Sequence, residues 1–291
     1  MRIFTLAVSV LPAALAILSA PGAAAGETCD LTPTRTGHVA RVIDGRTLVL
    51  KSGETVRLTG VLAPEAPAWW KGPGAWGPAA RAAQALERLV AGRRVGLAIE
   101  PRMHDRHKRL LAHLFIADGP ERLWVQGRLV AGGHARAFSL GGAQACMRAL
   151  QAREARARGS QAGLWRHSWY AIVGAGETAQ LARRRYSFQI VEGLIVSVGR
   201  TRSWTFLNFG ADYKTDFTVA IKARDRRSFG GSDVDLENLA GRRVRVRGWV
   251  ERWNGPVIKA TRPEQIELLA EPGQRQKKNP APQATPGSIN L

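Results

Sequence analysis

Two arginines and one glutamate stand out because each lies in or beside a strand-like segment that is otherwise apolar. Arg57 is a charge inside the run TVRL, Glu65 follows it across a turn at Pro64, and Arg109 begins another apolar run. An arginine guanidinium donates paired hydrogen bonds to phosphate oxygens and stays charged at any ordinary pH. Cleavage of a phosphodiester needs such groups on the phosphate, together with a base for the attacking water.

The elements around these residues are expected to form a small closed β-barrel of the OB type. An Asp-Gly turn at 44–45 and a Ser-Gly turn at 52–53 separate the first strand-like segments. Apolar alternation and helix end signals then give the remaining elements. The expected strands are 47–50, 55–58, 95–99 and 109–116, and the expected helices are 78–91, 122–131 and 143–158.

Three ordered blocks resemble the thermonuclease family, the staphylococcal-nuclease-like phosphodiesterases, over roughly residues 38–167. The resemblance implies the same barrel fold. The matching residues are DGRT at 44–47 with RLTGVLAPE at 57–65, DRHKRLLA at 105–112, and GLW at 163–165 after a helix rich in Ala, Arg and Glu.

The resemblance also implies roles for individual residues. Family members use a glutamate near the attacking water, two arginines on the phosphate, and a calcium ion held mainly by two aspartates. Matching positions make Glu65 the base and Arg57 and Arg109 the phosphate ligands. The aspartate positions hold Arg46 and Leu62, neither of which can bind an ion that takes about six to eight oxygen ligands. We therefore expect no calcium site of the family type, and we leave another divalent metal open.

Each of these assignments has an alternative. Arg46 could contact the phosphate in place of the metal. Alternatively, Arg57, Glu65 and Arg109 could form an ion-pair cluster that only supports the barrel. In the loop 63–77, Lys71 and its neighbouring tryptophans could bind a base and its phosphate. The tryptophan rings could equally cover the barrel.

Residues 168–185 are expected to be a linker, and 186–270 a second, OB-like barrel. Residues 243–247 alternate Arg and Val, which places the arginines on one face of a strand. OB-type modules stack bases on aromatic rings while basic side chains follow the backbone. The alternative is that the aromatics fill the core and the arginines are merely solvated. The predicted nucleic-acid contacts are Trp204, Phe206, Arg243, Arg245 and Arg247.

The two ends of the chain differ from the rest in composition. Residues 1–25 are typical of a signal peptide, with Arg2 before an apolar run and three alanines at the cleavage site. Residues 26–37 form a polar N-terminal segment, and the Pro-rich tail 271–291 is expected to be disordered. No later stretch is long and apolar enough to span a membrane. We expect a periplasmic or secreted protein.

The expected export affects the predicted oxidation state of the two cysteines. An oxidising compartment predicts a disulfide between Cys29 and Cys146, the alternative being two unrelated thiols.

A formal net charge of +20 favours a polyanionic partner. We expect DNA or RNA, with an anionic glycan or lipid surface as the other candidate. The leading prediction is an exported endonuclease of the thermonuclease type, weakened by loss of the calcium aspartates. The alternative is a non-catalytic envelope protein that binds nucleic acid or another polyanion.

Overall fold

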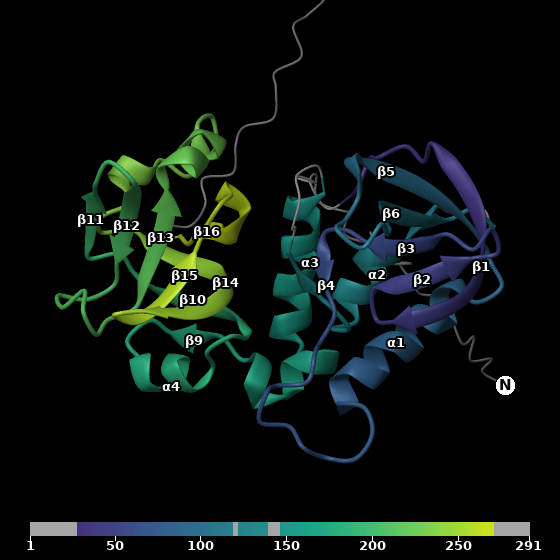
Figure 1. Ribbon diagram of the computed structural model, residues 1–291, viewed down its shortest axis with the longest axis horizontal. Helices are drawn as coiled ribbons and strands as arrows, with labels where there is room; N and C mark the ends of the chain where they lie inside the picture. Colours follow the sequence, from purple (N-terminus) through teal and green to yellow (C-terminus); the bar gives the residue numbers. More distant parts are fainter. Residues whose placement is uncertain (1–27, 119–121, 139–145, 271–291) are drawn as a thin grey trace, which may run out of the picture.

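Two β-rich lobes lie side by side in the computed structural model, which describes residues 28–118, 122–138 and 146–270 (Figure 1). The first lobe contains β1–β8 and the second β9–β16, with α3 at the junction. The predicted signal peptide and the Pro-rich tail lie outside the described residues. Across the described ranges, no helix combines the length and the hydropathy that a membrane span requires.

Five strands of the first lobe close into a barrel in the order β3-β2-β1-β5-β6, and β6 returns to pair with β3 in parallel. One long strand, β1, serves both of its neighbours: residues 35–38 pair with β5 and residues 39–44 pair with β2. The strands are β1 (Arg35–Asp44), β2 (Thr47–Leu50), β3 (Thr55–Leu58), β5 (Arg94–His104) and β6 (Leu110–Ile116).

Short strands and three helices surround this barrel. β7 (Leu123–Trp124) extends the sheet beside β6, and β4 (Val61–Leu62) pairs with β8 (Arg136–Ala137). The helices are α1 (Gly77–Val90), α2 (Val125–Ala131) and α3 (Met147–Gly159). In α1, Ala82, Leu86 and Val90 are spaced four apart and fully buried, which is why this helix packs one face on the barrel.

The closed barrel of OB type is confirmed, with small differences in its elements. The first turn lies at 45–46, because β1 continues through Asp44. The expected helix 122–131 begins only at Val125, because Leu123 and Trp124 pair with β6. The expected helix 143–158 is described from Met147 onward.

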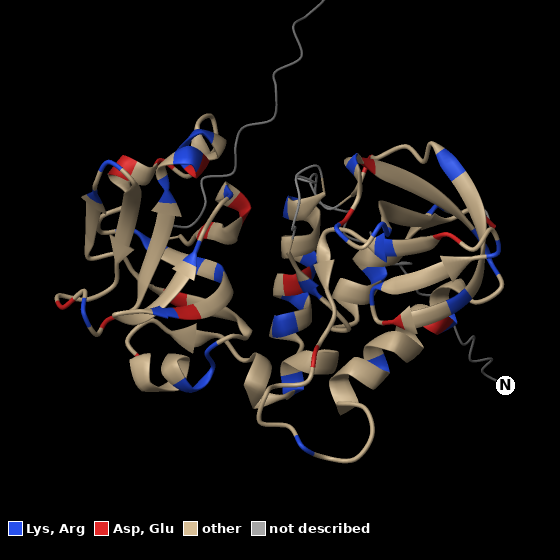
Figure 2. Ribbon diagram, in the orientation of Figure 1, with Lys and Arg blue, Asp and Glu red and all other residues tan. Residues whose placement is uncertain are grey.

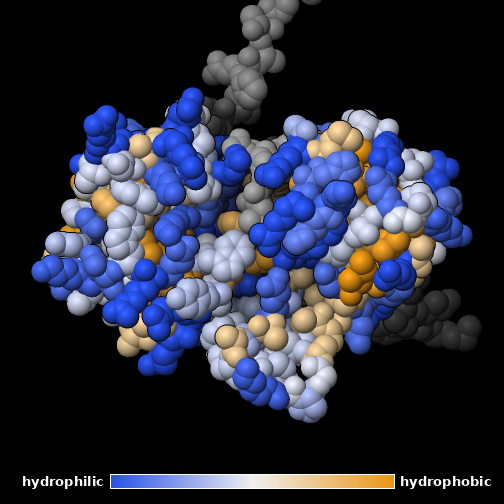
Figure 3. Space-filling view, viewed as in Figure 1, coloured by the Kyte–Doolittle hydropathy of each residue, from blue (hydrophilic) through white to orange (hydrophobic). Residues whose placement is uncertain are grey.

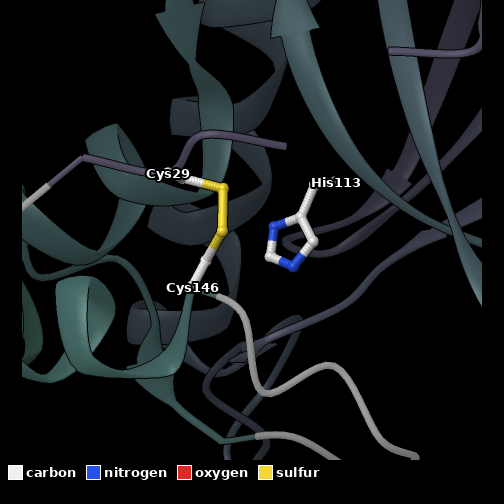
Figure 4. A group of neighbouring side chains, drawn as sticks. All are labelled: Cys29, His113 and Cys146. Atoms are coloured by element: carbon white, nitrogen blue, oxygen red, sulfur yellow. A yellow bond between two sulfur atoms is a disulfide. The ribbon is translucent and has the colours of Figure 1, made fainter. Parts of the chain in front are cut away.

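The predicted disulfide is present and joins Cys29, ahead of β1, to Cys146 at the start of α3 (Figure 4). The imidazole of His113 lies beside it, and the three potential ligand atoms are within 4.8 Å of one another. The two sulfurs are bonded to each other, so they are not thiolate ligands for a metal.

The second lobe repeats the strand order of the first. Its sheet runs β11-β12-β13-β15-β14-β10. Because β10 and β11 follow each other in the chain, the sheet returns to its first strand. As in the first barrel, the third and fifth strands, here β13 and β15, pair in parallel. The strands are β10 (Phe188–Leu194), β11 (Ser197–Arg200), β12 (Trp204–Asn208), β13 (Thr218–Lys222), β14 (Arg243–Trp253) and β15 (Gly255–Lys259).

This order agrees with a second OB-like barrel, an assignment that stays a prediction. Short elements complete the lobe. They are β9 (Val173–Gly174), β16 (Ile266–Leu268), α4 (Thr178–Arg183) and the 3-10 turns η2 (Ser168–Tyr170), η3 (Ala223–Phe229), η4 (Leu236–Asn238) and η5 (Pro263–Gln265). The 3-10 turn η1 (Gly163–Arg166) belongs to the first lobe, where the Leu164 N–H donates a hydrogen bond to the Gly133 carbonyl.

The segment 168–185 differs from the expected linker because it is folded onto the second barrel. β9 pairs in parallel with β10, and Leu181 of α4 is fully buried. The guanidinium of Arg184 donates hydrogen bonds to the carbonyl oxygens of Ser168 and Trp169. The polar composition of the segment predicted a linker, because it does not reveal the few residues that pack on the second lobe.

A third core joins the two lobes. Phe138 of the first lobe contacts Phe188 and Trp249 of the second, with ring centroids 4.9 and 5.2 Å apart and edge-to-face geometry. Arg247 of β14 donates a 2.8 Å hydrogen bond to Glu154 of α3, and both side chains are buried. Aromatic packing and a buried ion pair therefore hold the barrels together.

Candidate phosphate site at the lobe junction

A cavity of about 380 Å³ opens where β3 and β6 lie side by side. The parallel pairing sets Arg57 opposite Leu111, two residues beyond Arg109. Side chains two residues apart in a strand share a face, so both predicted phosphate-binding arginines reach the same cavity. Its wall also contains Phe138 and Trp249. The second lobe thus contributes to the site, which the sequence did not predict.

Arg109 is held in place by Asp105. Its Nε and Nη2 atoms lie 2.7 and 2.6 Å from Asp105 Oδ2, and its backbone N–H donates to Oδ1. Burial alone would raise the pKa of Asp105, but the hydrogen bonds from Arg109 and from the backbone of His107 outweigh it and lower that pKa to about 2. The carboxylate therefore stays ionised and orients the guanidinium.

Arg57 is half-buried and has no hydrogen-bond or ion-pair partner among the described side chains. Burial, followed by repulsion from Arg46 and Arg109, lowers its pKa to about 10. The group remains charged at neutral pH. Five arginines and two carboxylates line this cavity, so the positive charge is incompletely neutralised, which favours a bound anion there.

Arg46 occupies the position where the resemblance places a calcium aspartate. It is 8% exposed, and its Nη2 donates a 2.7 Å hydrogen bond to Glu65 Oε1. Burial lowers the pKa of Arg46, partly offset by Glu65. The second aspartate position, Leu62, is 3% exposed and packs in the junction core. A guanidinium and an isobutyl group supply no ligands for Ca²⁺, so these residues do not fit that ion.

Glu65 reaches the arginines only through Arg46. Its side chain is 69% exposed and lies in the wall of a second cavity of about 230 Å³, not the first. The Arg46–Glu65 pair therefore spans the two cavities. Oε1 is engaged by Arg46, and Oε2 has no hydrogen-bond partner among the described residues.

Sequence reasoning missed Glu100 and His113, which lie behind the arginines. Glu100 lines the first cavity and accepts a 3.1 Å hydrogen bond from Thr59 Oγ1. Burial raises the pKa of Glu100, partly countered by this bond. His113 Nε2 lies 3.6 Å from Glu100, and burial lowers the pKa of His113 to about 4. In the sequence, Glu100 could have been noticed because it is a charged residue at the end of the apolar run LAIE.

The three alternating arginines at the start of β14 are paired with carboxylates, whereas Arg57 in the cavity is not. Arg243 and Arg245 both pair with Glu192 on β10, and Arg245 also reaches Glu267. Arg247, predicted as a nucleic-acid contact, is 0% exposed, and its burial contradicts that prediction. Its face of the strand meets the first lobe instead of water.

The predicted aromatic residues of the second barrel are half-buried and cluster. Trp204 and Phe206 stack at 6.3 Å, and Trp253 packs edge-on against both. Trp253 is 41% exposed, so part of the cluster faces solvent. Lys71 is exposed and lines neither cavity.

Comparison with known families supports the first barrel only. Residues 55–167 match the family described as staphylococcal nuclease homologue, a stretch that begins at β3. A search among curated proteins found no match for the chain. The matched stretch contains Arg57, Glu65 and Arg109 and supports a function related to nucleic acid. The first barrel is therefore a staphylococcal-nuclease-like domain, as its motifs predicted.

Proposed function

We propose that the protein is an exported phosphodiesterase that cleaves nucleic acid without calcium. Arg57 and Arg109 bind the phosphate, and Glu65 takes a proton from the attacking water. The family match supports a nuclease-like role. The Cys29–Cys146 disulfide agrees with an oxidising compartment outside the cytoplasm.

The observation that carries this proposal is that Arg57 has no hydrogen-bond or ion-pair partner among the residues that the structure describes. A half-buried guanidinium beside two others costs free energy, as its lowered pKa records. A phosphate in the cavity would relieve the repulsion and accept paired hydrogen bonds. Negative charge that grows on the phosphate during attack would be stabilised by the same groups.

Arg46 would take part of the electrostatic role of the missing metal. It supplies one positive charge and orients Glu65 through their 2.7 Å hydrogen bond. A guanidinium cannot make a bound water more acidic as a metal ion does. We therefore expect slow cleavage that is indifferent to chelators.

The test is cleavage of labelled single-stranded and duplex DNA and RNA by the mature protein, with calcium, magnesium or chelator. Arg57→Ala and Glu65→Gln should each lower the rate by about 10²–10³-fold, whereas the exposed control Arg88→Gln should leave it unchanged. The chelator should have no effect. Cleavage that persists in both variants would refute the assigned roles.

A second candidate is binding without cleavage, favoured because Arg46 engages one oxygen of the predicted base. It predicts tight, salt-sensitive binding and no product under any condition. An excess of heparin should then compete no better than unlabelled nucleic acid at equal charge. Preferential displacement by heparin would instead indicate a general polyanion binder.

A further inference from the structure

The second cavity continues the site across the lobe junction. Trp249 lines both cavities, so the two lie next to each other on either side of this residue. Its ring packs edge to face on Phe138 and Phe188, which holds it at the junction. On the opposite wall, the Arg46–Glu65 pair bridges the two cavities. A ligand in the first cavity would therefore have to pass Trp249 to reach the second.

Two exposed arginines mark the far wall of this path. In the run Arg183-Arg184-Arg185, the middle residue is buried and pinned by hydrogen bonds to carbonyl oxygens and to Gln189 Oε1. Arg183 and Arg185 are exposed in the wall of the second cavity. Neither has an acidic partner among the described side chains. Arg184 thus acts as an anchor that presents its two neighbours to the cavity.

The next residue, Tyr186, is a conformational outlier. Its φ is 60°, in the left-handed region that a bulky residue rarely adopts. Its backbone N–H donates a 2.7 Å hydrogen bond to the Val250 carbonyl, which fixes this conformation. The side chain is nonetheless 77% exposed. A strained backbone that holds an aromatic ring out in solvent points to a function for the ring.

The chemistry of the whole path is that of a single-strand binder. Eight arginines and three carboxylates line the two cavities, and Trp69, Trp169 and Trp249 join Tyr186 in the wall of the second. Lys and Arg occur on both lobes (Figure 2), and hydrophilic residues cover most of the visible face (Figure 3). Bases stack on such rings only when they are unpaired, while arginines follow the phosphates.

We propose that a single strand of nucleic acid, held by one phosphate at Arg57 and Arg109, passes Trp249 and continues into the second cavity. There a base stacks on Tyr186, and Arg183 and Arg185 bind the following phosphates. The second lobe is then part of the substrate site and not a separate module. This inference rests on the proposed function, because it extends the same phosphate site.

The test measures binding, so it does not depend on cleavage. The probes are a fluorescent single strand of about 12 nucleotides, a duplex of the same length, and a nucleoside 3′,5′-bisphosphate that fits the first cavity alone. The variants are Arg183→Gln/Arg185→Gln and Tyr186→Gly. The matched control is Arg88→Gln/Arg93→Gln, which removes equal charge from exposed positions that line neither cavity.

The double variant should weaken single-strand binding beyond the control. Its plot of log affinity against log salt should be shallower by about 1.4, since each phosphate contact contributes about 0.7. Tyr186→Gly should weaken the single strand about tenfold. Glycine favours the left-handed conformation, so this loss cannot be attributed to unfolding if the melting temperature holds. Binding of the bisphosphate should be unchanged in all variants.

Three results would overturn the inference, each in a recognisable way. Single-strand binding equal to that of the control would remove the second cavity from the site while leaving the proposed function intact. An equal loss for the duplex would exclude selective binding of a single strand. Failure of the unmodified protein to bind any strand would overturn the proposed function as well.

Discussion

The two lobes share a strand order but differ in how their arginines are neutralised. In each, one long or divided first strand pairs on both sides, and the third and fifth strands are parallel. In the first barrel, Arg57 faces the cavity without an ion-pair partner among the described residues. In the second, Arg245 and Arg247 lie on a strand face where Glu192, Glu267 and Glu154 compensate them.

The difference shows that strand position alone does not make an arginine a ligand-binding group. An ion-paired guanidinium must release its carboxylate before it binds phosphate, and a buried one must also break the packing around it. An unpaired, half-buried guanidinium can bind phosphate without releasing a carboxylate and without disrupting the packing around it. We therefore propose that the phosphate to be cleaved binds at the first barrel, and that Arg243, Arg245 and Arg247 of β14 serve the structure.

The largest expected difference between the barrels concerns the disulfide, which only the first contains among the described residues. Cys29→Ser/Cys146→Ser should lower the free energy of unfolding by about 5 kcal/mol, because the bond closes a loop with a sequence separation of 117. Chemical denaturation followed by the near-ultraviolet signal measures this. Reductant should mimic the substitution in the unmodified protein and have no effect on the variant. An unchanged midpoint would contradict the prediction.

The buried Arg247–Glu154 ion pair at the junction should contribute more to stability than the exposed ion pairs of the same strand. Arg247→Met leaves Glu154 without its partner from the second lobe and should cost roughly 3 to 5 kcal/mol. Arg243→Met, on the same strand but exposed, is the matched control and should cost less than about 1 kcal/mol. Thermal unfolding of both variants provides the comparison. Equal destabilisation would show that burial of the pair carries no special cost.

The pH dependence of stability should also differ between the barrels. Burial lowers the pKa of His113 to about 4 from 6.5, and residues 186–270 contain no histidine. The unfolded chain therefore binds the proton more tightly. Stability is complete above pH 6.5 and falls by up to about 3 kcal/mol as the pH approaches 4.

The measurement is urea denaturation between pH 4 and 7, compared with His113→Gln. The substitution should flatten the curve in this window. Asp105 does not contribute to this change, because its pKa is lowered to about 2 in the folded protein. Its contribution to stability is lost only when the pH falls below its ordinary pKa of 3.8. A variant with the same slope as the unmodified protein would exclude His113 as the cause.

The smallest effect on nucleic-acid affinity is expected from Arg243, the exposed arginine at the start of β14. Arg243→Gln should change affinity for a single strand by less than about twofold, because Glu192 already compensates this charge. Arg57→Ala, measured in the same titration, should lower affinity far more. A large effect of Arg243→Gln would mean that nucleic acid displaces Glu192 and that the second barrel binds phosphate directly.

Local pattern in the sequence predicted most of the strands and the first helix. Alternation and turn residues specify these elements because both act over a few neighbouring residues. The motifs also predicted roles for Arg57, Glu65 and Arg109, and they placed Arg46 and Leu62 at the two aspartate positions, since these are statements about residue types at matching positions. The even cysteine count, together with the expected export, predicted the disulfide that the structure contains.

Only the tertiary structure decided what each charged side chain meets. Alternation placed Arg243, Arg245 and Arg247 on one face but could not show that this face ends against α3, where Arg247 is buried with Glu154. The pairing of β3 with β6 and the meeting of the lobes at Trp249 are contacts between distant segments. Periodicity records which side of a strand a residue lies on, whereas burial and charge compensation depend on which segment packs there.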